Sequence, residues 1–225
     1  MSLPGVERPD LPEFMTWEEL EQLPEEIADQ IELWDGRVVW VRRGFGNRPA
    51  DARPGEHQTA MRRLTNELER CARDEMSAPP EGRWRANFET NVFFGSTGKS
   101  DFVTPDFLVH RCLPPGSDVR ATDTVLVGEV LSPSNTPSEI EAKKARYASA
   151  CIASYWEVDL TPDLTGIGAL RVYILEIGHA ELPPGVRPLR NANYLLAGEW
   201  VPESGAGISF PYPFSIEIPW AALAF

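Results

Sequence analysis

Cysteine is scarce in this chain of 225 residues and occurs only at Cys71, Cys112 and Cys151. An odd number of cysteines, far apart and with no CxxC pair, argues against a disulfide framework and against a zinc site. Because free cysteine is usually buried, the sequence predicts that each of the three is a small core residue.

Long apolar runs are absent as well. No stretch approaches the roughly 18 consecutive apolar residues that a membrane-spanning helix needs. The start of the chain, MSLPGVERPD, lacks the basic and then apolar order of a signal peptide. We therefore expect a cytoplasmic protein with no membrane partner.

Basic residues are outnumbered, since 21 Lys and Arg face 34 Asp and Glu and give a formal net charge of −13. A protein that coats nucleic acid with a uniformly basic surface is therefore excluded. The charge is uneven: it is −10 in residues 1–36, +4 in residues 37–85 and −7 in the rest. The arginine-rich middle block allows a modest DNA-facing surface, although scattered charge more often marks a solvated face.

The length and composition fit one soluble domain, and no internal repeat or long linker divides the chain. Near the N-terminus, Thr16 and Glu19 form a capping box for a short helix that Pro24 interrupts. Two apolar runs then flank an Asp-Gly pair, the preferred type I′ turn, and predict a β-hairpin over residues 31–41.

A long amphipathic helix is predicted from Glu56 to about Met76, because apolar residues recur at three- and four-residue spacing between Met61 and Cys71. His57 lies beside this apolar stripe, where a histidine is more often an ordinary core residue. The polar side of the helix carries Arg62, Arg63, Arg70 and Arg73.

Runs rich in Val, Leu, Ile and aromatic residues predict strands along the rest of the chain. They cover residues 88–94, 102–110, 124–131, 154–158, 171–177, 194–201 and 215–218. Ser138 and Glu141 form a second capping box, which starts a helix that runs to about Ala150. This order of elements predicts a mixed α/β fold with one central sheet.

Two acids interrupt apolar strands: Asp106 in FVTPDFLVH and Glu129 at the end of VLVGEV. A buried acid is costly unless it is paired, hydrogen-bonded or bound to a cation. The two strands can lie side by side with both acids at one end of the sheet, which suits a hard cation such as Mg²⁺. On these residues alone, structural roles for both acids are equally open.

The helix that follows Glu129 presents Glu139, Lys143 and Tyr147 on one face. A lysine in this position can reach toward a phosphate held by the metal and offset its charge. Lys144 is one position round the helix and is expected to point elsewhere.

The motifs, in this order, resemble the PD-(D/E)XK nuclease superfamily and, more closely, the Uma-two family of candidate restriction endonucleases. In that family PD on one strand, EVxSPS on the next, an acid-x-x-x-Lys-x-x-x-Tyr helix and an EYW-x-VD strand follow one another. This chain has TPDFLV and then GEVLSPSNTPSEIEAKKARYASACIASYWEVD. The upstream IELWDGRVV hairpin and His57 at the start of the long helix extend the match, which covers about Thr16 to Asp159.

The resemblance implies a restriction-endonuclease-like fold, in which a mixed central β-sheet is flanked by helices and preceded by an N-terminal helix and β-hairpin. It divides a single domain, residues 1–225, into an acidic N-terminal helical segment (1–30), a nuclease-like core (31–159) and a strand-rich extension (160–225).

The resemblance also implies that Asp106 and Glu129 bind Mg²⁺, or alternatively Mn²⁺, with the backbone carbonyl of Val130 as a third ligand. Lys143 stands in for the superfamily lysine, which this chain lacks at the usual tripeptide position, and His57 enters the site from the long helix. The implied activity is endonucleolytic cleavage of DNA. By analogy, two sites in a homodimer would cut the two strands.

Two positions depart from the family pattern, since the helix acid is Glu139 instead of Asp and Ser154 replaces the acid before Tyr-Trp. Glu89 is open between a site-facing acid and an edge residue, and Tyr147 and Trp156 are expected in packing. Two other functions remain open. One is a silent nuclease-fold module for binding or assembly, which the charge of −13 motivates, and the other is a metal-dependent hydrolase of a small phosphate ester.

Overall fold

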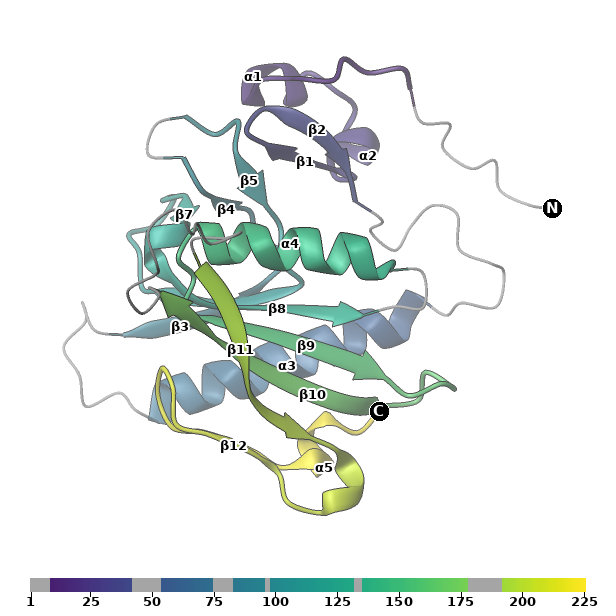
Figure 1. Ribbon diagram of the computed structural model, residues 1–225, viewed down its shortest axis with the longest axis vertical. Coiled ribbons are helices and arrows are strands. Elements are labelled where there is room, and N and C mark those ends of the chain that lie inside the picture. Colours follow the sequence, from purple (N-terminus) through teal and green to yellow (C-terminus); the bar gives the residue numbers. More distant parts are fainter. Residues whose placement is uncertain (1–8, 42–53, 75–82, 96–97, 132–134, 178–191) are drawn as a thin grey trace, which may run out of the picture.

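A six-stranded sheet lies at the centre of the computed structural model (Figure 1). The structure describes residues 9–41, 54–74, 83–95, 98–131, 135–177 and 192–225. The central strands, in spatial order, are β11 (Ala192–Trp200), β10 (Ile167–Ile177), β9 (Ser154–Leu160), β8 (Thr124–Leu131), β6 (Phe107–Arg111) and β3 (Trp84–Phe88). Only β8 and β9 pair in parallel, so the sheet is mixed, as predicted.

Two helices cover the opposite faces of this sheet, α3 (Pro54–Asp74) and α4 (Pro137–Ser149) (Figure 1). Alternate strand residues point to opposite faces. Phe107 therefore packs in the core beside α3, whereas Leu108 packs in the core beside Tyr147 of α4. The long helix confirms the predicted amphipathic pattern, and its N-terminal turn carries His57; residues 75 and 76 lie outside the described residues.

Helix α4 begins where a proline fixes the first turn, and this corrects the predicted cap. The N-cap is Thr136 and not Ser138: the Thr136 side chain accepts from the backbone N–H of Glu139, whose carboxylate accepts from the N–H of Thr136. Pro137 in the first turn has the backbone angle that a helix start requires. The cap therefore falls two residues earlier than the prediction.

A second, five-stranded sheet holds the N-terminal hairpin. Its strands, in spatial order, are β2 (Arg37–Trp40), β1 (Ile31–Trp34), β5 (Phe102–Val103), β4 (Val92–Phe93) and β7 (Val119–Arg120). The predicted hairpin is confirmed, and both turn residues have positive φ, 52° at Asp35 and 80° at Gly36, as a type I′ turn demands. The short helices α1 (Trp17–Leu20) and α2 (Glu25–Ala28) pack on this sheet, and the predicted Thr16–Glu19 capping box is present.

Two strands that the sequence predicts as continuous are each divided between the two sheets. The run 88–94 breaks after β3, where Glu89 has φ 43°, before the chain enters β4. The run 102–110 breaks between β5 and β6, at Thr104-Pro105-Asp106. Proline cannot donate to a sheet ladder, so the second break is one that Pro105 favours. The predicted central sheet is present, but these two runs also supply strands to the second sheet.

The C-terminal part of the chain completes the core over α3. Beyond β11, it forms the hairpin of β12 (Ile208–Phe210) and β13 (Ile216–Ile218) and the short helix α5 (Trp220–Leu223). Within the described residues, single 3₁₀ turns occur at η2 (Ala121–Asp123) and η3 (Pro202–Ser204). The buried residues Ile208, Ile216 and Leu223 belong to the same apolar cluster as the inner face of α3.

The cysteine prediction holds for one residue of three. Cys71 is buried on α3, but Cys112 and Cys151 are exposed. Both exposed residues follow the end of an element: Cys112 comes after β6, and Cys151 lies in the turn after α4 with φ 59°. No helix in the part of the chain that the structure describes is long and apolar enough to cross a membrane.

Candidate active site

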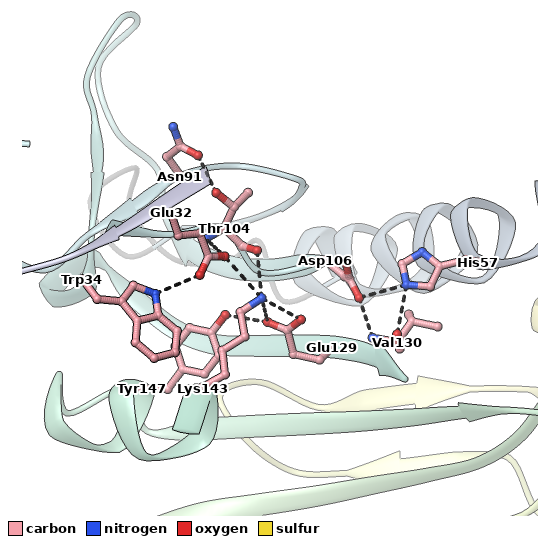
Figure 2. Close-up of polar contacts among 10 residues, drawn as sticks. All are labelled: Glu32, Trp34, His57, Asn91, Thr104, Asp106, Glu129, Val130, Lys143 and Tyr147. Atoms are coloured by element: carbon pink, nitrogen blue, oxygen red, sulfur yellow. Dashed lines mark hydrogen bonds and ion pairs between the residues drawn. The ribbon is translucent and has the colours of Figure 1, made fainter. Parts of the chain in front are cut away.

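Asp106 and Glu129 lie side by side where β6 begins and β8 ends (Figure 2). The strands are antiparallel with Phe107 opposite Gly128, so the next pair outward is Asp106 and Glu129. A side chain at Gly128 would collide with the Phe107 ring, since a Cβ there would lie 2.0 Å from it. The backbone N–H of Val130 donates to Oδ2 of Asp106 at 2.6 Å and fixes the acid against β8.

His57 reaches this pair from the first turn of α3. Its Nε2 lies 3.2 Å from Oδ2 of Asp106 and 2.9 Å from the carbonyl oxygen of Val130. Because a carbonyl oxygen can only accept, Nε2 carries the hydrogen in this arrangement. His57 thus contacts two of the three groups that the family resemblance implies as metal ligands.

The pKa values of the two acids are shifted in opposite directions. Burial alone raises the pKa of Asp106, but the charge and hydrogen bond of His57, together with Lys143 and the Val130 N–H, outweigh it and leave that pKa below its usual value. For Glu129, burial prevails over the opposing effect of Lys143 and raises the pKa to about 7. Glu129 is therefore the acid whose ionisation falls in the neutral range.

Lys143 points into the site from α4 (Figure 2). Its Nζ lies 2.8 Å from Oε1 of Glu129, donates to the carbonyl oxygen of Thr104 at 3.2 Å, and lies 3.4 Å from Oε1 of Glu32. Burial alone lowers the lysine pKa, but the carboxylates of Glu129, Glu32 and Asp106 outweigh it and raise that pKa above its ordinary value. Lys143 therefore keeps its charge over the whole neutral range.

A sequence model of the Uma2 family, described as "Putative restriction endonuclease", matches residues 17–185. The chain belongs to the Uma2 family. This membership supports a nuclease function in general terms. No curated protein matches the chain. Among solved structures, the chain is similar to a protein described as a "putative nuclease belonging to DUF820" from Anabaena variabilis, with 15% identity, a TM-score of 0.49, and coverage of 88% of this chain and 89% of that one.

Two residues that contact Glu129 or Lys143 were not predicted as site residues. Tyr147, expected in packing, is buried and donates its hydroxyl hydrogen to Oε1 of Glu129 at 2.6 Å. Glu32 is a fully buried acid on β1. Its signal in the sequence is an acid inside the apolar strand IELW, the same signal that singles out Asp106 and Glu129.

Other residues that the sequence analysis considered lie away from Asp106, Glu129 and Lys143. Glu139 caps α4 and is exposed. Lys144 points elsewhere, as predicted, and its Nζ lies 2.7 Å from Oε1 of Glu157. The side chain of Glu89 is exposed, although its backbone N–H donates to the carbonyl oxygen of Asp106. Ser154 is buried and accepts from the indole N–H of Trp156.

Three of the four arginines on α3 have partners within the chain. Arg63 donates to the carbonyl oxygen of Ala224, and Arg70 donates to that of Glu217. Arg73 donates to the carboxylate of Glu69. These contacts favour a structural role for α3 over the DNA-facing surface that its sequence allowed.

The candidate site fits a hard divalent cation in its chemistry. Asp106, Glu129 and the Val130 carbonyl offer only oxygen ligands, which Mg²⁺ prefers. Among the described residues, no group of three or more His, Cys, Asp or Glu side chains could hold a metal. The protein would thus supply few ligands, and water or substrate would supply the rest. Burial, with the charge of Asp106, raises the pKa of Glu129 to about 7 against the opposing effect of Lys143.

Proposed function

We propose that this Uma2 protein is a Mg²⁺-dependent endonuclease that hydrolyses phosphodiester bonds of DNA. The observation that carries the proposal is the meeting of Asp106 and Glu129 at one end of the central sheet, with the Lys143 ammonium 2.8 Å from Glu129. Acids and a lysine converging on one point match the demands of phosphoryl transfer, where charge must be offset around the scissile phosphate.

Asp106, Glu129 and the Val130 carbonyl would hold the cation. When bound, Mg²⁺, or Mn²⁺ in its place, would activate a water and polarise the scissile phosphate. Lys143 would offset the negative charge that develops on the phosphate oxygens. His57 would orient Asp106 and the Val130 carbonyl, because its Nε2–H contacts both oxygens.

The direct test is cleavage of plasmid DNA with and without Mg²⁺. We expect Asp106→Ala, Glu129→Ala and Lys143→Ala each to abolish Mg²⁺-stimulated cleavage while the fold survives, as circular dichroism would report. Lys144→Ala is the matched control, since Lys144 is adjacent on α4 but pairs with Glu157, and it should cleave normally. Cleavage by Asp106→Ala at the wild-type rate would contradict the proposal.

The second candidate function is a catalytically silent nuclease-fold module for binding or assembly. The engagement of the α3 arginines within the chain favours it, because few basic groups on that helix remain for phosphates. Calorimetric titration with Mg²⁺ separates the two. Metal binding that is lost in Glu129→Ala supports the enzyme, whereas the absence of binding at millimolar Mg²⁺ supports the silent module.

A further inference from the structure

Glu32 is a charged residue in a place where charge is costly. It lies on β1 of the hairpin sheet, with none of its surface exposed. An ionised carboxylate in such a position is tolerated only when its oxygens are fully paired. Its partners therefore show what this side chain does.

Three hydrogen-bond donors converge on the Glu32 carboxylate (Figure 2). Oε1 accepts from the backbone N–H of Thr104 at 2.9 Å, and Oε2 accepts from the indole N–H of Trp34 at 3.0 Å. The Lys143 ammonium lies 3.4 Å from Oε1. A neutral amide cannot replace this group without loss, because its NH₂ half would face a donor instead of accepting from it.

Thr104 connects Glu32 to the acid that begins the central strand. Its N–H donates to Glu32, and its carbonyl oxygen accepts from Lys143 at 3.2 Å. The next residues are Pro105 and Asp106, which lie where the chain passes from one sheet to the other. Glu32 therefore fixes the segment that leads into Asp106 as well as the lysine opposite Glu129.

The Lys143 ammonium has three N–H donors, and the structure places three acceptor groups around it. They are the Glu129 carboxylate, the Thr104 carbonyl and the Glu32 carboxylate. Two of the three come from outside the strand that carries Glu129. Without Glu32, a long flexible side chain would be held mainly by Glu129.

We propose that Glu32 is a positioning residue that holds the Lys143 ammonium and the Thr104–Asp106 segment in register, so that the N-terminal hairpin completes the active site. The inference rests on the proposed function in one respect, the use of Lys143 in cleavage. The alternative role for Glu32 is a purely structural link between the two sheets.

The test compares Glu32→Gln with Glu157→Gln. Glu157 is the matched control because it is also buried and pairs with the neighbouring Lys144, at 2.7 Å. The chain has three lysines, Lys99, Lys143 and Lys144. Their rates of acetylation by a water-soluble reagent, read by peptide mass spectrometry in the folded protein, report how firmly each ammonium is held.

We expect Glu32→Gln to remove the protection of Lys143 and leave that of Lys144 unchanged, and Glu157→Gln to do the reverse. In steady-state cleavage of plasmid DNA, kcat should fall about a hundredfold in Glu32→Gln with unchanged KM, and both should stay normal in Glu157→Gln. Unchanged protection of Lys143 in folded Glu32→Gln would overturn the proposal, and so would normal cleavage by a variant whose Lys143 is unprotected.

Glu32→Asp replaces the amide variant if Glu32→Gln does not fold. It keeps the charge and both acceptor oxygens, but its side chain is shorter by one methylene, which draws the carboxylate away from Lys143 as well as from Thr104 and Trp34. Lys143 should again lose protection, and wild-type protection would overturn the proposal. Because acetylation requires no activity, a wild-type protein that fails to cut DNA refutes the proposed function and leaves the positioning role to be decided by the lysine rates.

Discussion

Among single residues, Glu129 has a charge that depends on both burial and its immediate partners. Burial raises its pKa to about 7, while Lys143 and the Tyr147 hydroxyl oppose that rise. Burial also raises the pKa of Tyr147 well above its usual value, so the hydroxyl stays protonated and remains a donor. The state of Glu129 near neutral pH thus results from a balance between burial and the Asp106 charge, which raise its pKa, and two side chains of α4, which lower it.

Tyr147→Phe should move the pH dependence of cleavage. Removing the hydroxyl deletes a hydrogen bond that lowers the pKa of Glu129, so the rise of Mg²⁺-stimulated cleavage with pH should shift to higher pH. The measurement is a pH–rate profile under single-turnover conditions. Tyr173→Phe is the matched control, because Tyr173 donates to Glu157 instead, and its profile should equal that of the wild type. Superimposable profiles for Tyr147→Phe and the wild type would refute this role.

Glu129→Gln should change how stability varies with pH in the absence of metal. The folded pKa of Glu129, about 7, lies above the ordinary value of 4.5. The folded protein thus binds a proton that the unfolded chain releases, and this contribution to stability is lost as pH rises from 4.5 through 7. The free energy of unfolding of Glu129→Gln, relative to that of the wild type, should therefore increase by about 2 kcal/mol between pH 5 and pH 8. Urea unfolding in EDTA at both pH values measures the gain, and a pH-independent difference would contradict it.

The residues predicted for the site were found by one of two signals. Each is a charged or polar group that either interrupts an apolar pattern or belongs to a family motif. These signals located Asp106, Glu129 and Lys143, which the structure brings together. Glu32 has the first of these signals but lies 72 residues from Thr104 in the chain, and only the sheet pairing reveals that they meet. Tyr147 was assigned to packing because an aromatic ring on an inner helix face has the same pattern whether or not its hydroxyl is used.

At the scale of secondary-structure elements, the fixed start of α4 determines where its lysines point. Thr136→Ala should destabilise the protein by about 1 kcal/mol, because it removes the acceptor for the Glu139 N–H. Ser138→Ala is the control, since Ser138 lies inside the helix and should cost less. Urea unfolding of the two variants measures the difference. Equal losses would mean that Thr136 is not the cap.

Helices and the hairpin were predictable because their signals are local. An Asp-Gly turn, an apolar period and a helix cap each involve residues that are close together in the sequence. The positions where strands change sheets were not. Glu89 takes a left-handed conformation and Pro105 divides two apolar runs, but neither residue says that the pieces join different sheets. Sheet membership depends on long-range pairing, such as Leu33 with Phe102, which one sequence alone does not encode in a local pattern.

Over the whole molecule, the net charge of −13 opposes the approach of a polyanion. The first 36 residues hold −10 of it and include the buried Glu32, which joins the partly buried Asp106 and Glu129 in the site, against Lys143 and His57. Charges beyond about 10 Å are screened at 0.1 M salt, so the acids of the site should weigh more on a bound phosphate than distant ones. A divalent cation at the site would change the sign of the local electrostatic potential from negative to positive.

DNA affinity should therefore depend on the divalent cation, and variants that each remove one acid should show whether the acids of the site cause this dependence. In EDTA, Glu129→Gln should bind DNA more tightly than the wild type, because one acid is gone from the site. In millimolar Ca²⁺, used as an oxygen-preferring probe, the wild type should gain about tenfold in affinity and Glu129→Gln should gain little. Glu203→Gln, which removes an exposed acid in η3, is the control because it has the same net charge as Glu129→Gln. Its DNA affinity should change with Ca²⁺ as that of the wild type does. Fluorescence anisotropy with labelled DNA at constant salt measures all three. If Glu203→Gln and Glu129→Gln behaved alike, net charge alone would govern binding and the acids of the site would have no special part in it.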